Sequence, residues 1–345
     1  MLDLSADGVR SILGRSQPDA RLMPRAWIGW CLWLLCAPLV AFAAETWPRA
    51  PGTQLRAVAW NVSREQFFEQ RAGFVAVLRA IDADLIVLDE MPADRGERDV
   101  LEVLHTIDVD PTVPWQVVYG SSGDNQRAVI ALRGPAQAMD AFFPLPYPPS
   151  YLRWARTLPL PPARRARMLE NLAAGIAAAG AEVRVGDRRL LVVGVDLQCC
   201  GDSDDAWEET RRFVEVRAIR VVLDRAWKVR KPHAVIVAGD FNAVRGRRIV
   251  REMQGSKHHP ARRLLVAEAV HADGSTHWTW DGRGTPFPSR PIDFLLHSRE
   301  LQALQALVFD SETMSAAQRE SLGLNATHMR SLSEHRPVVV DLRWR

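Results

Sequence analysis

The chain has 345 residues, of which 47% are hydrophobic and 25% are charged, and its formal net charge is +3. This length is enough for one large domain or two ordinary ones with a buried core, and the composition is that of a globular protein. The small net charge excludes a protein that coats nucleic acid through overall basicity, so any polyanion must bind to a local basic patch.

An uncharged stretch lies near the start of the chain. Residues 26–44 contain no charged residue, follow Arg25, and include the small-x-small sequence Ala41-Phe42-Ala43. We therefore predict that residues 1–44 are a signal peptide and that the protein is exported, either periplasmic or secreted. The alternative is an uncleaved N-terminal helix that anchors the chain, since the stretch is just long enough to span a membrane. Met23 is a second candidate for the true start of the protein.

Residues 45–54, which contain prolines and a glycine, are predicted to be a linker, and residues 55–345 are predicted to be a single domain. The predicted strands are Leu55–Val62, Asp84–Leu88, Trp115–Tyr119, Ala128–Leu132, Leu190–Val195, Ala234–Ala238, Ile292–Leu296 and Pro337–Leu342. The predicted helices are Glu65–Ala80, Ala206–Lys231 and Arg245–Met253. We expect the long helix to turn its arginines outward. The variable connections favour an α/β domain with a mixed sheet over a strict βαβ repeat.

A segment rich in proline and arginine, at about residues 140–180, interrupts the pattern of strands. Residues 144–162 hold seven prolines, and a basic, Ala-rich helix is predicted from there to about Ala179. A stretch of this length between strands is either a lid over a functional site or a surface insertion, and we favour the insertion.

Polar side chains recur where a predicted strand ends or begins. They are Asn61, Glu90, Asp196, Asp240, Asn242, Asp293, Glu334 and His335. In a layered α/β protein, such positions can converge on one edge of the sheets, where ligands bind. Taken singly, Asn61 would also suit a turn, and Asp240 and Asn242 a helix cap. A histidine such as His335, beside an acid and before a buried strand, is a poor choice for a core. The other histidines, His271 included, are interpreted as surface or loop residues.

The chemistry available at these strand ends is that of a hard cation. Asn61, Glu90 and Glu334 offer oxygen ligands, which suit Mg²⁺ or Mn²⁺ and not Zn²⁺. The sequence contains no HExxH or CxxC pair, no GxxxxGK(S/T) loop and no GxSxG elbow. Their absence argues against a zinc site, a P-loop nucleotide hydrolase and a serine esterase.

The order of these residues resembles the endonuclease/exonuclease/phosphatase superfamily, which has the fold of pancreatic-type deoxyribonuclease and of exonuclease-III-like repair enzymes. The resemblance runs from about Leu55 to the C-terminus. Its motifs are Trp60-Asn61, Glu90, Gly239-Asp240-Phe241-Asn242, Thr276-His277-Trp278-Thr279-Trp280, Arg290-Pro291-Ile292-Asp293-Phe294 and Ser333-Glu334-His335-Arg336-Pro337. Gly-Asp-x-Asn alone would be a weak signal, but in this order, with a terminal Ser-acid-His-x-Pro, it is specific.

The resemblance implies a four-layer α/β sandwich, in which helices flank two central mixed β-sheets. It implies a metal-dependent phosphoester hydrolase in which Glu90 binds Mg²⁺ or Mn²⁺, with Asn61 close by. Glu334 stands where the family prefers an aspartate, and its longer side chain can still ligate the metal.

The resemblance also implies catalytic roles. Asp240 should activate or orient the attacking water, and Asn242 should hold water or phosphate. Asp293 should fix His335, which stabilises the negative charge of the transition state.

One position departs from the family. Asp196 lies where the family has a histidine or tyrosine that contacts phosphate, and an ionised carboxylate cannot donate a hydrogen bond to phosphate. Three interpretations remain open: Asp196 binds a second cation, Gln198 supplies the missing donor, or Asp196 only secures the turn at residues 199–201.

Three classes of phosphoester are candidate substrates. Nucleic acid is the first, because Arg245 and Arg290 belong to a group of arginines that could hold a phosphate backbone. The second is a phospholipid or sphingomyelin head group, with residues 142–154 as a peripheral membrane contact. The third is a soluble phosphomonoester. A catalytically weak binding protein that retains the fold is the alternative to an enzyme. The sequence gives no sign of an obligate protein partner.

Overall fold

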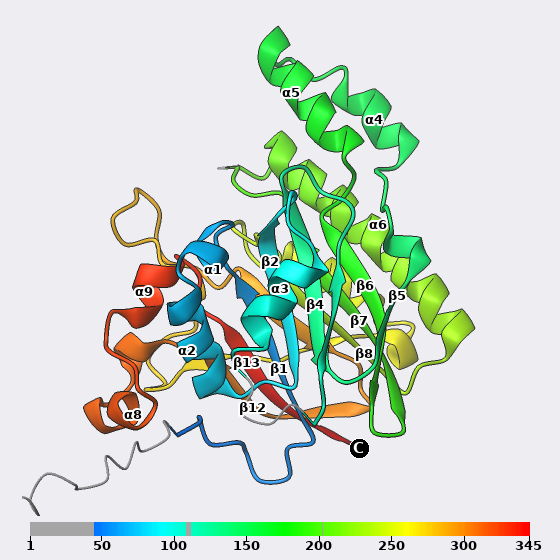
Figure 1. Cartoon of the computed structure of the whole chain (residues 1–345). Coiled ribbons are helices and arrows are strands. Elements are labelled where there is room, and N and C mark those ends of the chain that lie inside the picture. Colours follow the sequence, from blue (N-terminus) through cyan, green and yellow to red (C-terminus); the bar gives the residue numbers. More distant parts are fainter. Residues whose placement is uncertain (1–44, 108–111, 202) are drawn as a thin grey trace, which may run out of the picture. The chain divides into compact units, whose positions relative to one another are not determined.

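The structure is a computed structural model that describes residues 45–107, 112–201 and 203–345, and this part of the chain contains two β-sheets (Figure 1). The seven-stranded sheet has the order β10 (Val270–His271), β12 (Leu301–Val308), β13 (Val338–Trp344), β1 (Leu55–Asn61), β2 (Leu85–Pro92), β4 (Gln126–Arg133) and β3 (Trp115–Tyr119). The six-stranded sheet has the order β5 (Ala136–Ala138), β6 (Ala178–Val185), β7 (Arg188–Asp196), β8 (Ala234–Asp240), β11 (Asp293–His297) and β9 (Leu265–Val266).

Both sheets are mixed. β1 runs parallel to β2 and antiparallel to β13, while β7 runs parallel to β8 and antiparallel to β6. The strands predicted from the sequence are all present, although several bounds differ by a few residues.

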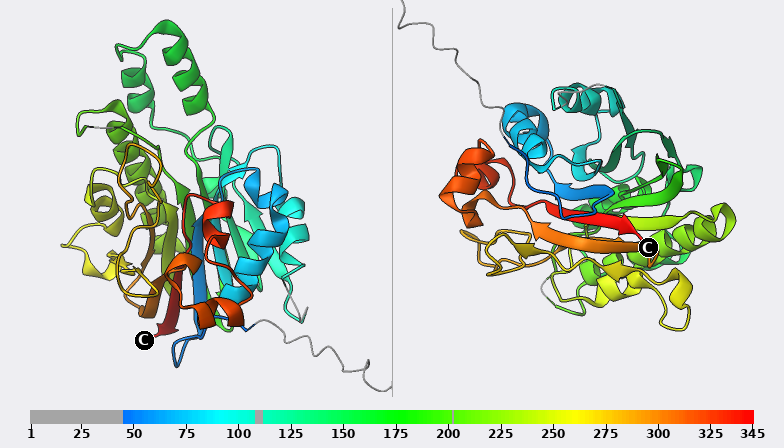
Figure 2. Two further views of the ribbon diagram at one scale, coloured as in Figure 1. Left: turned by 90° about the vertical axis from the view of Figure 1, so that its left-hand side faces the viewer. Right: turned by 90° about the horizontal axis from the view of Figure 1, so that it is seen from below.

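Helices cover the outer face of each sheet, as the end-on view in Figure 2 shows. The helices on the side of the seven-stranded sheet are α1 (Gln66–Glu69), α2 (Arg71–Ile81), α3 (Glu97–Leu104), α8 (Ala316–Ser321) and α9 (His328–Leu332). Those on the other side are α4 (Pro149–Ala155), α5 (Pro162–Ala173), α6 (Trp207–Arg230) and α7 (Arg248–Gln254). Three 3₁₀ turns complete the set: η1 (Asp140–Phe142), η2 (Pro260–Arg262) and η3 (Ser311–Thr313). The four-layer sandwich implied by the family resemblance is thus confirmed.

Alternate residues of the central strands explain the layers. In β7, Leu190 and Val192 point into the core between the sheets, and Leu191 and Val193 point into the core under the helices. Both faces of each central strand are therefore buried, which is why these strands are continuous apolar runs instead of alternating ones.

The structure corrects two predicted helices. The helix expected to reach Ala179 ends at Ala173, because Gly175 adopts a φ of +85° and residues 178–185 form β6. All eight residues of β6 pair with β7, and this pairing overrides the helical propensity of alanine. The helix expected over residues 65–80 is divided at Gln70 into α1 and α2.

Two predictions of exposure are also wrong. Arg211, Arg212 and Arg220 of α6 are buried, because each meets a carboxylate within one turn of the same helix. His271 is buried as well, and its Nε2 lies 2.8 Å from the carbonyl oxygen of Trp278.

The predicted linker contains no helix or strand, but it is anchored to the domain. Trp47 is buried in the core, and its carbonyl oxygen accepts a hydrogen bond from Arg56 at 2.7 Å. The Ala50 amide donates to Asp341 at 2.7 Å, and the same carboxylate pairs with Arg56.

The predicted signal peptide, residues 1–44, lies outside the described residues. Within residues 45–107, 112–201 and 203–345, no helix combines the length and the apolar character that crossing a membrane requires.

Candidate active site

Strand register brings the polar strand ends together. In the parallel pair β1 and β2, Asn61 lies opposite Asp89, and in the parallel pair β7 and β8, Asp196 lies opposite Asp240. β11 begins with Asp293, which lies opposite Asp240 in an antiparallel pair. Because parallel strands end at the same edge of a sheet, one edge of the sandwich collects polar residues from both sheets.

The run Gly239-Asp240-Phe241-Asn242 has a separate structural reason for each residue. Gly239 has a φ of +131°, and a Cβ there would lie 2.0 Å from the carbonyl oxygen of Val195, so only glycine allows β7 and β8 to approach. Phe241 is fully buried against Phe294.

Asn242 closes the turn after β8. It adopts a left-handed φ of +46°, its amide donates to Asp240 Oδ1 at 2.6 Å, and its Nδ2 donates to the Leu197 carbonyl oxygen at 2.8 Å. The second oxygen of Asp240 accepts from Asn61 Nδ2 at 3.4 Å. Asn242 and Asn61 therefore fix Asp240 from both sides, and Asn242 also ties the turn to the loop after β7.

Three buried carboxylates share this edge. One oxygen each of Asp89, Asp196 and Asp240 lie within 4.8 Å of one another. Neither oxygen of Asp89, nor Oδ2 of Asp196, has a hydrogen-bond partner among the described residues. Burial, followed by the charges of neighbouring acids, raises the pKa of Asp89 and of Asp196 well above 3.8 and that of Asp240 to about 8.

Glu90 lies beside this carboxylate cluster, at a bulge in β2. The pairing of β2 with β4 shifts between Leu88 and Met91, and Glu90 adopts a left-handed φ of +54°. Its side chain is half-buried and lies 3.8 Å from the guanidinium of Arg64. After burial, the charge of Glu90 is the largest cause of the raised pKa of Asp196, so this carboxylate acts on the cluster.

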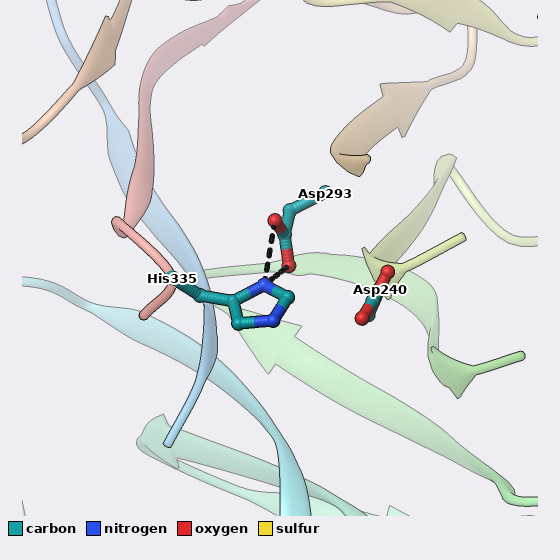
Figure 3. A group of neighbouring side chains, drawn as sticks. All are labelled: Asp240, Asp293 and His335. Atoms are coloured by element: carbon teal, nitrogen blue, oxygen red, sulfur yellow. Dashed lines mark hydrogen bonds and ion pairs between the residues drawn. The ribbon is translucent and has the colours of Figure 1, made fainter. Parts of the chain in front are cut away.

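His335 completes the site from the seven-stranded side. Figure 3 shows that its Nδ1 faces both oxygens of Asp293, at 3.0 and 3.1 Å, with Asp240 nearby. Burial lowers the pKa of His335, but the charge and hydrogen bond of Asp293 outweigh this and raise the pKa to about 9. The imidazole is therefore protonated at neutral pH, and its Nε2–H can donate.

Residues of the family motifs hold these two side chains in place. Thr279 Oγ1 accepts from the amides of Ile292 and Asp293, both at 3.0 Å. Ser333 Oγ accepts from the His335 amide at 3.0 Å and donates to the Asn61 carbonyl oxygen at 2.8 Å. The hydroxyl of Ser333 thus joins the end of β1 to the histidine.

Buried charges of α6 hold the loop that follows Asp196. Glu215 accepts from the Gln198 amide at 2.7 Å, and Arg212 donates to the carbonyl oxygens of Gln198 and Cys200 at 2.5 and 2.9 Å. Tyr147, from the segment before α4, donates its hydroxyl hydrogen to Glu215. The Gln198 side chain donates to the Cys199 carbonyl oxygen at 3.0 Å.

Three predicted site residues lie apart from the carboxylate cluster. Glu334 is exposed and accepts from Trp280 Nε1 at 3.3 Å, whereas its neighbour His335 is buried. Arg245 is exposed and pairs with Asp204 at 3.1 Å. Arg290 donates to the Val244 carbonyl oxygen at 2.6 Å, and this hydrogen bond stabilises the turn after β8.

Asp89 is not among the site residues predicted from the sequence, although one feature of the sequence points to it. It is an ionisable residue that directly follows the apolar run Leu85-Ile86-Val87-Leu88 in a strand buried on both faces. Such a residue is rarely buried without a partner, and a functional role is the usual reason when it is.

The donor set fits a hard divalent cation. Unpartnered carboxylate oxygens from two sheets converge, and their mutual repulsion is what a cation would relieve. Oxygen-only ligands of this kind are those that Mg²⁺ and Mn²⁺ prefer.

The sequence matches the model of the Endonuclease/Exonuclease/phosphatase family over residues 58–315. A comparison with curated proteins gave no match. Several solved structures share the fold. The human Nocturnin catalytic domain with bound sulfate anion is 15% identical, with a TM-score of 0.51 over 84% of this chain and 94% of that one.

Two further structures are similar to the same extent. The 3′ phosphatase NExo from Neisseria, bound to a product DNA hairpin, is 16% identical, with a TM-score of 0.51 over 84% of this chain and 100% of that one. Truncated Caenorhabditis elegans TDP2 is 13% identical, with a TM-score of 0.51 over 84% of this chain and 98% of that one. At these identities the likeness concerns the fold alone.

Proposed function

The chain belongs to the endonuclease/exonuclease/phosphatase family, and on that basis we propose that it is a Mg²⁺- or Mn²⁺-dependent phosphodiesterase that acts on nucleic acid. One observation carries the proposal. Three buried carboxylates, two of which have unpartnered oxygens, lie beside a histidine whose pKa is raised to about 9. This arrangement pairs a cation site with a fixed hydrogen-bond donor, which is what a phosphoester needs as negative charge develops on its oxygens.

The residues that would hold the cation are Asp89, Asp196 and Asp240, with Glu90 at the margin of the cluster. A bound cation would neutralise phosphate oxygens and make a bound water more acidic. This assignment replaces Glu334 with Asp89, because Glu334 is exposed and Asp89 is buried among the acids. It also makes Asp196 a metal ligand. This role accounts for a carboxylate at the position where the family has a residue that contacts phosphate.

The other side chains act on the substrate and the water. Asp240 would orient the attacking water, because Asn242 and Asn61 hold its carboxylate from both sides. His335 donates Nε2–H to a phosphate oxygen, while Asp293 fixes the ring and its charge. Asn242 keeps its side-chain oxygen available for water or phosphate while Nδ2 holds Leu197.

A nucleic-acid substrate is favoured over a lipid by the surface of the segment from residue 142 to 154. Phe142, Tyr147 and Tyr151 are buried there, and Trp154 is the one large exposed apolar side chain. This leaves little apolar surface to enter a membrane, whereas arginines are abundant in the following residues.

A panel of substrates tests the proposal. Purified protein is assayed with plasmid DNA, single-stranded RNA, sphingomyelin and a nitrophenyl phosphomonoester, each with Mg²⁺, Mn²⁺ or chelator. We expect metal-dependent cleavage of a nucleic acid that weakens as salt rises. Turnover of sphingomyelin or of the monoester alone would replace the substrate class, and no turnover of any of them would favour a binding protein.

We also propose that the protein is exported after cleavage near Ala44, on the strength of the uncharged stretch at residues 26–44. N-terminal sequencing of the native protein should recover Glu45 or a close neighbour. Recovery of Leu2, or of Pro24 in a membrane fraction, would contradict cleavage, and the second result would favour the anchored form.

A further inference from the structure

The helices α4 and α5 form a lobe, residues 149–173, that stands clear of the two sheets (Figures 1 and 2). The lobe stands beyond the edge at which α6 begins, and α6 follows the loop that starts at Asp196. Arg164 of the lobe lies 3.8 Å from Glu208 in the first turn of α6. The lobe therefore lies beside the first turn of α6, a helix whose buried charges hold the loop that follows Asp196.

The lobe carries a strong positive charge. Residues 149–173 contain five arginines, one glutamate and no other charged side chain, in a chain whose whole net charge is only +3. Arg153, Arg156 and Arg167 are exposed and form no ion pair with any described residue. Arginine is the cation best suited to bind phosphate groups, because its planar guanidinium can donate two hydrogen bonds at once.

An aromatic column leads from the buried base of the lobe to its surface. Tyr147 and Tyr151 stack with ring centroids 5.6 Å apart, and Tyr151 meets Trp154 at 5.3 Å. Tyr147 and Tyr151 are buried, while Trp154 is 36% exposed and lies between Arg153 and Arg156 in the sequence. The column holds the indole in place, so a flat group can stack on it at little cost in conformational entropy.

We propose that this lobe is a binding site for single-stranded nucleic acid, separate from the catalytic centre. A base stacks on Trp154, and the neighbouring phosphates bind exposed arginines of the lobe, Arg153 and Arg156 among them. Exposed aromatic rings with flanking cations are a common way to hold a single strand without reading its sequence. The proposal rests on the proposed function, since it makes the lobe a guide that leads a strand into the site. A membrane is disfavoured because Trp154 is the one large apolar side chain of the lobe that is exposed.

Binding is measured by fluorescence anisotropy of a labelled oligothymidylate on the full chain in chelator, so that cleavage cannot interfere. The test variants are Trp154→Ala and the double variant Arg153→Glu with Arg156→Glu. We expect the first to weaken binding roughly fivefold or more, and Trp154→Phe to restore most of it. We expect the second to weaken binding roughly tenfold or more and to lower the salt slope by about 1.4, or about 0.7 for each lost phosphate contact.

The matched control is Arg225→Glu with Lys228→Glu, which makes the same change of charge near the other end of α6, where both residues are exposed. It should leave binding within about twofold of the unaltered chain, since screening makes distant charges weak. Equal loss in the control and in the lobe variant would overturn the proposal, as would unchanged binding by both lobe variants. Binding of the lobe to vesicles of phosphatidylglycerol, with none to the oligonucleotide, would also overturn it and assign a membrane instead.

A second readout separates this proposal from the proposed function. The lobe variants should hydrolyse bis(p-nitrophenyl) phosphate at the rate of the unaltered chain, because that small diester does not reach the lobe. If the unaltered chain binds the oligonucleotide through the lobe but hydrolyses nothing, binding by the lobe is confirmed, while the enzymatic function fails and the lobe's role as a guide fails with it.

Discussion

Three carboxylates of the site, those of Asp89, Asp196 and Asp240, occupy one buried volume, and their charges must be compensated. Protons or a divalent cation can do this, and the raised pKa values describe the first solution. A cation that displaces the protons provides the second, and only the second makes the cluster useful for phosphoester chemistry.

Asp89 and Glu334 give opposite predictions for metal binding. Asp89→Asn removes a buried carboxylate that is proposed as a metal ligand, so it should abolish the rise in melting temperature on adding Mn²⁺ and lower activity roughly 100-fold or more. Glu334→Gln alters an exposed side chain that pairs with Trp280, so the melting shift should persist and activity should stay within about threefold. A lost melting shift in Glu334→Gln together with a normal one in Asp89→Asn would reverse the assignment.

The raised pKa of Asp240 predicts how metal affinity depends on pH. Because the pKa of about 8 lies above the ordinary 3.8, the metal-free folded protein keeps this proton below about pH 8. A cation must displace it, so Mn²⁺ affinity should rise with pH up to about 8, by about tenfold per pH unit for one proton, and then level off. Calorimetric titration in buffers of different ionisation enthalpy would measure the released proton. An affinity that is constant from about pH 6 to about pH 8 would contradict a protonated cluster.

The sequence revealed the site residues unequally, for a physical reason. Asp240 and Asp293 follow or open apolar strands within specific motifs, so their position at the sheet edge was predictable. Asp89 and Glu90 are neighbours, and in a regular strand they would point to opposite faces. The bulge in β2 and the left-handed Glu90 let both acids act on one cluster, and nothing in Leu88-Asp89-Glu90-Met91 announces a bulge.

Among the secondary-structure elements, β1 and β13 are joined by a buried ion pair as well as by their ladder. Arg56 and Asp341 lie opposite each other in the register, and the Nε–Oδ1 distance is 2.7 Å. Arg56 also donates to the carbonyl oxygens of Trp47, Pro48 and Ile81. One guanidinium therefore fixes the residues before β1 to the middle of the seven-stranded sheet.

Asp341→Asn should destabilise the fold by about 3–5 kcal/mol at neutral pH, because it leaves Arg56 buried without its counter-ion. Burial raises the pKa of Asp341, but the hydrogen bonds and charge of Arg56 outweigh this and lower it below 3.8. The carboxylate thus stabilises the fold above pH 3.8, and this stability is lost as the pH falls through the lowered pKa of Asp341. Denaturant unfolding at neutral and acidic pH should show the gap between the two proteins closing in acid.

Asp187→Asn is the matched control for that experiment. Asp187 is 94% exposed and pairs with Arg188 at 3.7 Å, so its removal should have no measurable effect on unfolding. Equal stability of Asp341→Asn and the unaltered chain would show that the pair contributes little.

Strand composition decided which elements could be predicted. The strands found in the sequence are apolar runs rich in valine and isoleucine, such as Val235-Ile236-Val237. β6 and β12 were not found, because Ala178–Val185 and Leu301–Val308 are rich in alanine, leucine or glutamine, which favour helices. Pairing with β7 and β13 makes them strands, and such long-range pairing is invisible in a local window.

The whole molecule divides its active site between the two sheets. The seven-stranded sheet supplies Asn61 and Asp89, and His335 lies just before its strand β13. The six-stranded sheet supplies Asp196 and Asp240. The site therefore exists only when the two sheets are stacked. Hydrophobic periodicity predicted a mixed α/β domain, but the stacking of two sheets came from the family motifs alone, since packing between layers leaves no local pattern.

The central claim is that these buried carboxylates make the chain a metal-dependent phosphoester hydrolase. The most direct measurement is the rate of nitrophenol release from bis(p-nitrophenyl) phosphate by the full chain and by Asp240→Asn, with Mn²⁺ and with chelator. We predict turnover with Mn²⁺, none in chelator, recovery when metal is restored, and a loss of roughly 100-fold or more in the variant. A rate that persists in chelator, or that survives Asp240→Asn in a folded protein, would contradict the claim.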